Sequence, residues 1–180
     1  LQEKFHFIEL DEKTPIPLKN RYQTPATLGK DRLAAAVGGH SLFPGHDVLV
    51  INAGTCVTYD VVTREGEYLG GAISPGMVMR FRALHTFTGK LPLLDFTEEP
   101  DFPGNTTEKS IISGVINGMI AEMEAIATGL GVKYPDLQVI LSGGDLNYFD
   151  KRLKISIFAL PNIVVYGLYQ ILKLNVDPIR

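Results

Sequence analysis

Residues 48–62 have the sequence VLVINAGTCVTYDVV. Its first four residues form a continuous apolar run, which is typical of a strand buried on both faces. The turn at Ala53-Gly54-Thr55 breaks the run. From Cys56 to Val62 apolar and polar side chains then alternate, with Val57, Tyr59 and Val61 on one side. The stretch therefore predicts two strands joined by a tight turn.

The residues that follow extend this meander and then leave it. After a turn at 64–67, residues 68–73 predict a third strand. Ser74-Pro75 predicts the start of a helix, because serine suits an N-cap and proline the first turn. A second helix is expected from Asn105-Thr106-Thr107-Glu108, which resembles a capping box with an Asx cap. This helix is expected to carry an apolar stripe of Ile112, Val115, Ile116, Met119, Ile120 and Met123, and Gly129 or Gly131 is expected to end it.

The rest of the chain alternates strands and helices. We expect a strand over 137–141, a short helix over 146–153, a strand over 155–159 and a last helix after Pro161. The order predicts an α/β fold, a mixed sheet with helices on both faces. It is the order of a ribonuclease H-like unit, the half-domain duplicated in actin-like ATPases.

The segment before Pro44 fits the tail of a preceding copy of that unit. It holds a short apolar stretch at Phe5–Leu10 and a helix-like run at Lys30–Leu42, taken as the last strand and helix of that copy. The predicted organisation is a remnant of a first half over 1–44 and a complete second half over 45–180. The second half carries a helical insert at about 75–104.

Composition limits the function classes. The chain has 180 residues, 45% of them apolar and 21% charged, which is an ordinary globular composition. A net charge of -3 gives no basic stripe for nucleic acid. A lone cysteine, Cys56, excludes an intrachain disulfide and suits a reducing cytoplasm. Apolar runs fall short of the roughly 18 residues that cross a bilayer. We expect a cytoplasmic protein that binds neither nucleic acid nor membrane.

Two glycine-containing turns are candidate phosphate sites. Asn52-Ala53-Gly54-Thr55 offers backbone N–H groups and a hydroxyl, and Asp60 is expected near the same mouth. Ser142-Gly143-Gly144-Asp145 lies between a strand and a helix, where a ligand approaches the backbone closely. Each turn alone is more often only a connection between elements. Together, at corresponding sheet ends, they favour nucleotide binding.

Gly29-Lys30-Asp31-Arg32 opens the helix-like run. A carboxylate at Asp31 could orient a substrate hydroxyl, as phosphoryl transfer requires, and Arg32 could hold a carboxylate or a phosphoryl group. The alternative is a first-turn aspartate beside a solvated arginine. The tetrapeptide alone leaves both interpretations open.

Taken together, these blocks resemble type III pantothenate kinases along nearly the whole chain. The resemblance rests on six ordered blocks with matching intervals, which are Thr24–Arg32, Asn52–Thr55 with Asp60, Gly66–Gly76, Ala83–Leu84 with Lys90–Pro92, Gly104–Ser110, and Gly143–Gly144. It implies the actin-like fold and the ATP-dependent phosphorylation of pantothenate to 4'-phosphopantothenate, the first step of coenzyme A biosynthesis. It also implies Mg²⁺ bound through ATP, and a homodimer with pantothenate near the subunit interface.

The resemblance also implies residue roles. Asp31 would be the general base that takes the proton of the primary hydroxyl of pantothenate. The other implied contacts to pantothenate are Tyr22, Gly29, Lys30, Arg32 and Thr106. The implied contacts to ATP are Thr55, Gly54, Gly143 and Gly144.

Two departures qualify these expectations. Asn52 stands where the family has an aspartate that holds a monovalent cation, K⁺ or NH₄⁺. An asparagine oxygen still coordinates but lacks the negative charge that attracts the cation, so potassium dependence is in doubt. The family's first phosphate loop, an Asp-x-Gly-Asn type turn, has no counterpart among these residues and is expected upstream of Leu1.

Two other functions compete with this prediction. One is another small-molecule kinase of the actin-like fold, acting for example on a sugar or on acetate. The other is a degenerate, non-catalytic nucleotide-binding or regulatory module, which Asn52 favours.

Overall fold

A six-stranded mixed sheet forms the centre of the molecule. The computed structural model describes residues 7–94 and 99–176. The strand order is β1-β4-β3-β2-β5-β6, with β3 antiparallel to both neighbours and the remaining pairs parallel. The strands are β1 (Lys19–Asn20), β2 (Val48–Ala53), β3 (Cys56–Val62), β4 (Glu67–Pro75), β5 (Gln138–Ser142) and β6 (Phe158–Ala159). The predicted meander and mixed α/β sheet are confirmed.

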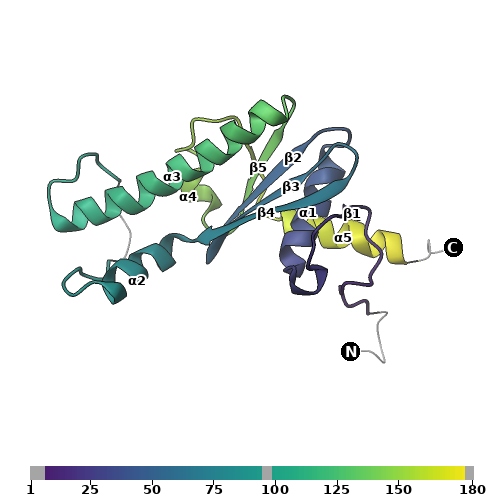
Figure 1. Cartoon of the computed structure of the whole chain (residues 1–180), viewed down its shortest axis with the longest axis horizontal. Helices are drawn as coiled ribbons and strands as arrows, with labels where there is room; N and C mark the ends of the chain where they lie inside the picture. Colours follow the sequence, from purple (N-terminus) through teal and green to yellow (C-terminus); the bar gives the residue numbers. More distant parts are fainter. Residues whose placement is uncertain (1–6, 95–98, 177–180) are drawn as a thin grey trace.

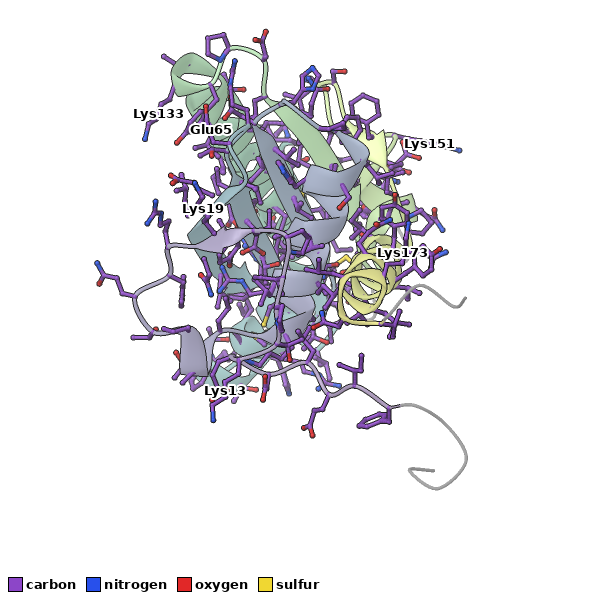
Figure 2. All side chains as sticks on the ribbon, turned by 90° about the vertical axis from the view of Figure 1, so that its right-hand side faces the viewer. Lys13, Lys19, Glu65, Lys133, Lys151 and Lys173 are labelled. Carbon is purple, nitrogen blue, oxygen red and sulfur yellow. The ribbon has the colours of Figure 1, made fainter. Side chains whose placement is uncertain are left out.

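Helices cover both faces of this sheet (Figure 1). One face carries α1 (Lys30–Leu42) and α5 (Ile163–Asn175), which pack on each other and on the sheet. The other carries α2 (Met77–Phe87), α3 (Thr107–Lys133) and α4 (Leu146–Phe149). A short 3-10 turn, Pro25–Thr27, precedes α1. Figure 2, viewed from the right-hand side of Figure 1, shows α1 and α5 in front of the strands.

The face under α3 holds the larger apolar core. The predicted stripe of α3 faces the sheet, with Ile116, Met119 and Met123 fully buried. From β3, Val57 and Tyr59 enter the same core, as the alternation predicts. By length and composition α3 could cross a membrane, but much of its apolar surface is covered by the protein, as in the core helix of a globular domain.

The face under α1 and α5 is packed unusually closely. A Cβ atom added at Gly38 would lie 2.6 Å from the carbonyl oxygen of Ile163, and one added at Gly167 would lie 1.7 Å from the carbonyl oxygen of Ala34. The two helix backbones therefore touch, which only glycine permits at both positions. As a result α1 and α5 form one closely packed layer.

Two predicted helix starts are wrong, the first because a tertiary strand pairing overrides a local preference. Ser74-Pro75 does not start a helix, because both residues pair with β3 as the end of β4. Gly76 is the N-cap of α2 instead. Thr106, rather than Asn105, caps α3, and its hydroxyl accepts a hydrogen bond from the Lys109 amide at 3.1 Å.

Other boundaries shift by a few residues. Gly129 and Gly131 lie inside α3, which ends at Lys133, just before Tyr134-Pro135. The predicted short helix and strand after Asp145 are shorter than expected, with α4 ending at Phe149 and β6 limited to Phe158–Ala159.

The strand predicted at Phe5–Leu10 is not formed by residues 7–10, and residues 5 and 6 lie outside the described part. Before α1, the described residues form a strand only at β1. The α1 prediction, Lys30–Leu42, is confirmed. The division at residue 44 stays a prediction, as does the helical insert at about 75–104.

Candidate functional site

The two glycine turns meet at one end of the sheet. Gly54 and Thr55, at the β2–β3 turn, line a cavity of about 610 Å³ with Gly144 and Asp145, which follow β5. The amide nitrogen of Gly144 lies 4.0 Å from the point where a Cβ on Gly54 would stand. The predicted meeting of the two turns is therefore confirmed, because β2 and β5 are parallel neighbours.

The backbone joins these turns directly. The Asp145 amide donates to the carbonyl oxygen of Ala53 at 3.0 Å. Gly143 has a φ of 97°, and a Cβ there would lie 2.1 Å from the same oxygen and 2.6 Å from Oδ1 of Asn52. Only glycine fits at this position. The Asn52 side chain therefore reaches the second turn.

Part of the phosphate prediction needs correction. The Gly54 N–H donates to the carbonyl oxygen of Cys56 at 3.0 Å, so it is already used within the turn. The exposed hydroxyl of Thr55 is the donor that this turn presents to the cavity. Burial raises the pKa of Asp145 on the opposite wall. Sequence reasoning missed Arg82 of α2, a cationic side chain on the cavity lining.

The start of α1 carries the predicted general base. Asp31 is exposed in the first turn of α1, and Gly29 is the N-cap residue. A Cβ on Gly29 would lie 2.6 Å from Oδ1 of Asp31, so the carboxylate folds back over the glycine. Lys30 is half-buried beside it. An exposed carboxylate at a helix start is able to meet a substrate hydroxyl.

Arg32 is not a solvated arginine, so that part of the alternative is wrong. Its side chain is buried, and it donates to Oδ1 of Asp60 from Nε at 3.0 Å and from Nη2 at 2.7 Å. Burial acts to lower the pKa of Arg32, but the Asp60 carboxylate outweighs this and raises it. For the carboxyl of Asp60, burial raises the pKa, although the hydrogen bonds from Arg32 and Tyr68 act to lower it. Asp60 is thus engaged under α1 by Arg32 and Tyr68 rather than by the Thr55 turn.

Tyr22 and Tyr68 complete this cluster. The Tyr68 hydroxyl donates to Oδ1 of Asp60 at 2.7 Å. The Tyr22 ring centroid lies 6.2 Å from that of Tyr68 and 5.8 Å from the guanidinium carbon of Arg32. Gly70, with a φ of 91°, allows Tyr22 to lie against β4, because a Cβ there would be 2.9 Å from the ring. Tyr22 and Arg32 are therefore brought together as predicted.

Thr106 lies in a different place. It lines a larger cavity, of about 1010 Å³, between α2 and α3, with Arg80 on the same wall. Within one chain the start of α3 and α1 lie toward opposite ends of the molecule (Figure 1). The structure does not bring Thr106 next to Asp31 in a single chain.

A second ionic cluster ties α2 and α3 to the sheet. Arg80 donates from Nη2 to Ser74 Oγ and to Oε2 of Glu122, both at 2.6 Å. The Tyr59 hydroxyl donates to Oε1 of Glu122 at 2.7 Å. Burial acts to raise the pKa of Glu122, but the hydrogen bonds from Arg80 and Tyr59 outweigh it, and the pKa is lowered. This cluster fixes one wall of the Thr106 cavity.

Among residues 7–94 and 99–176, no group of three histidine, cysteine, aspartate or glutamate side chains is arranged to hold a metal ion. The described residues thus offer no all-protein carboxylate cage. Asn52, whose Oδ1 lies against Gly143, is the oxygen donor that the sequence suggested.

Comparisons with known proteins identify relatives of this chain. The type III pantothenate kinase family model matches residues 2–129. A type III pantothenate kinase of Phocaeicola vulgatus is 53% identical over 171 residues, covering 95% of this chain and 71% of the relative. One of Christiangramia forsetii is 45% identical, covering 97% and 72%.

Among solved structures, a conserved Baf-family protein from Campylobacter jejuni shares the fold, with a TM-score of 0.63 at 22% identity. The match covers 88% of this chain and 68% of the Campylobacter jejuni chain. The motifs, the sheet and these sequence identities lead to one conclusion: the chain belongs to the type III pantothenate kinase family.

Proposed function

We propose that this protein is a pantothenate kinase, which transfers the γ-phosphoryl group of ATP to the primary hydroxyl of pantothenate and yields 4'-phosphopantothenate. The observation that carries the proposal is the 53% identity to a type III pantothenate kinase over 95% of the chain. The cavity between the Thr55 turn and the Gly144 turn supports it, because a nucleotide requires such a junction of backbone and hydroxyl donors. The product would enter coenzyme A synthesis.

Asp31 is the proposed general base of this reaction. It is exposed at the start of α1, where a carboxylate can accept the proton of an attacking hydroxyl. Tyr22 and the loop at Gly29, Lys30 and Arg32 are the proposed contacts to pantothenate. Thr55 and Gly54, with Gly143 and Gly144, are the proposed contacts to ATP.

The strand order supports a ribonuclease H-like unit. Strands β4-β3-β2-β5-β6 form a sheet in which β3 alone is antiparallel to its neighbours, with α1 and α5 on one face and α3 on the other. A homodimer is proposed for the complete enzyme. It would account for Thr106, because the partner's copy of this residue could approach a pantothenate bound near Asp31.

Magnesium is proposed to be carried on the phosphates of ATP, with no cage of protein carboxylates. Thr55 offers a hydroxyl on the cavity lining and Asn52 an amide oxygen against Gly143, a neutral donor set that suits a weakly held monovalent cation. When bound, such a cation would supply positive charge beside the phosphates. A requirement for K⁺ or NH₄⁺ is expected to be weaker than in relatives with aspartate there.

The first test is ATP-dependent phosphorylation of pantothenate by the full-length protein and its Asp31→Asn variant. We expect product from the parent and a loss of kcat on the order of 10²–10⁴-fold in the variant, because a general base contributes about that much. The thermal midpoint should not change, since Asp31 is exposed. Asp136→Asn, an exposed aspartate beyond the end of α3, is the matched control and should keep full activity. Full activity in Asp31→Asn would reject Asp31 as the base.

Asn52 favours a second candidate, a non-catalytic nucleotide-binding module. Such a module would bind ATP in a calorimetric titration yet form no phosphorylated product in the presence of K⁺ or NH₄⁺. The Asn52→Asp variant would form no product either. Product from the parent excludes this candidate. A panel of acceptors that includes sugars and acetate separates pantothenate kinase from other kinases of the fold.

A further inference from the structure

Asp60 is a buried carboxylate to which the proposed reaction assigns no part. It lies in the middle of β3, where its backbone pairs with Val50 on one side and Gly71 on the other. Its side chain is 1% exposed. A carboxylate held in a central strand and closed off from water has little freedom to move. It is a fixed point from which other groups can be oriented.

The fixed carboxylate holds one edge of the Arg32 guanidinium. The hydrogen bonds to Asp60 come from Nε and Nη2, so Nη1 takes no part in the ion pair. An arginine fork offers five N–H donors in one plane, and binding two of its nitrogens fixes the direction of the rest. Arg32 is in the first turn of α1, next to Asp31. Fixing its plane therefore also fixes the turn that bears the proposed base.

The same carboxylate controls Tyr22 through two routes. Arg32 lies 5.8 Å from the Tyr22 ring, and the Tyr22 hydroxyl stabilises its charge. Tyr68, hydrogen-bonded to Asp60, has its ring centroid 6.2 Å from that of Tyr22. Both proposed pantothenate contacts on this face, Tyr22 and Arg32, thus rest on one buried group.

We propose that Asp60 is a positioning residue for the acceptor site, with Tyr68 as its hydrogen-bond donor. Asp60 touches no substrate. It orients Arg32 and, through it and Tyr68, the Tyr22 ring, so that the acceptor meets a preformed surface beside Asp31. This inference rests on the proposed function. It makes a selective claim, that loss of Asp60 weakens acceptor binding and leaves the ATP site intact.

The test compares Asp60→Asn with the parent in steady-state kinetics and by calorimetric titration of pantothenate and of ATP. We expect the KM and Kd for pantothenate to rise at least about tenfold, the scale of one displaced charge-assisted hydrogen bond. The KM and Kd for ATP should stay within about twofold, because the Gly54–Gly144 cavity does not involve Asp60. Tyr68→Phe removes one hydroxyl and should give a smaller change of the same kind.

Asp47→Asn is the matched control, because Asp47 is another buried carboxylate of this sheet bound by an arginine, Arg64, at 2.7 Å. It should lower stability and leave both KM values unchanged.

Three results separate the possible failures. A parent without pantothenate kinase activity overturns the proposed function. The Kd values of the parent and of Asp60→Asn for pantothenate and ATP then still test the positioning role of Asp60. An active parent whose Asp60→Asn variant binds pantothenate normally, or loses ATP and pantothenate affinity alike, overturns the positioning role. If Asp60→Asn does not fold, Tyr68→Phe decides, and unchanged pantothenate binding there rejects the proposal.

Discussion

Two adjacent residues of β3 anchor two chemically similar clusters on opposite faces of the sheet. Asp60 faces α1 and binds an arginine and a tyrosine, Arg32 and Tyr68. Tyr59 faces α3 and binds a glutamate that in turn binds an arginine, Glu122 and Arg80. The groups are the same, but the side chains of the first ion pair are 6% and 1% exposed and those of the second 21% and 27%.

The difference in burial gives the two clusters different roles. Under α1, water cannot replace a lost partner, so the ion pair must be complete and its geometry is fixed. Between α2 and α3, water can reach both charged groups, which makes the bonds easier to break and reform. The first cluster is suited to preorganise a site. The second is suited to hold two helices that bound a large cavity.

The largest expected effect is on the buried cluster. Asp60→Ala should lower the free energy of unfolding by about 3–5 kcal/mol, because it leaves the Arg32 charge buried without a partner. Glu122→Ala should cost about 1.5–3 kcal/mol, the scale of hydrogen bonds to a charged group. Urea denaturation of both variants beside the parent measures the two losses. Equal losses would mean that the difference in burial has no energetic consequence.

Helix packing offers a second contrast between the faces. Gly167→Ala should destabilise the protein by about 1–3 kcal/mol, because the new methyl group would strike the backbone of α1. Gly129→Ala, in α3, meets open space and should gain about 0.5–1 kcal/mol. Thermal unfolding of the two variants gives the signs. A neutral Gly167→Ala would show that α1 and α5 can separate at little cost.

The smallest expected effect is a pH dependence in the half-buried cluster. Because the pKa of Glu122 is lowered in the fold, its ionised form stabilises the protein above its unfolded pKa of 4.5. That contribution is lost as the pH falls through the folded value. The stability advantage of the parent over Glu122→Gln should therefore shrink between about pH 6 and pH 3. Chemical denaturation across this range measures it, and a constant difference would contradict the lowered pKa.

The sheet could be predicted because its evidence is local. The apolar run of β2, the alternation of β3 and the stripe of α3 each follow from residues close in sequence. The start of α2 could not, because Ser74 and Pro75 carry helix-start preferences that pairing with β3 overrides. Local preference is a weak guide where a distant strand supplies hydrogen bonds.

The candidate site divides in the same way. The meeting of the two glycine turns could be predicted, because neighbouring parallel strands end at the same edge of a sheet. The burial of Arg32 could not be predicted, because it depends on Asp60, a residue far away in sequence. The Asp60 carboxylate was expected near the Thr55 turn instead. Arg82 was missed because the helix was predicted to start at Ser74-Pro75, whereas its N-cap is Gly76. With that start, the side of α2 that faces the cavity could not be identified.

The contact of α1 with α5 has a consequence for biosynthesis. The ribosome makes the Asp31 segment before α5, and the layer that holds α1 is complete only when Gly167 and its helix have been made. Contacts so distant in sequence form late in folding. The Gly29–Arg32 loop of a nascent chain is therefore present before it has its working shape, and it acquires that shape only once α5 has been made.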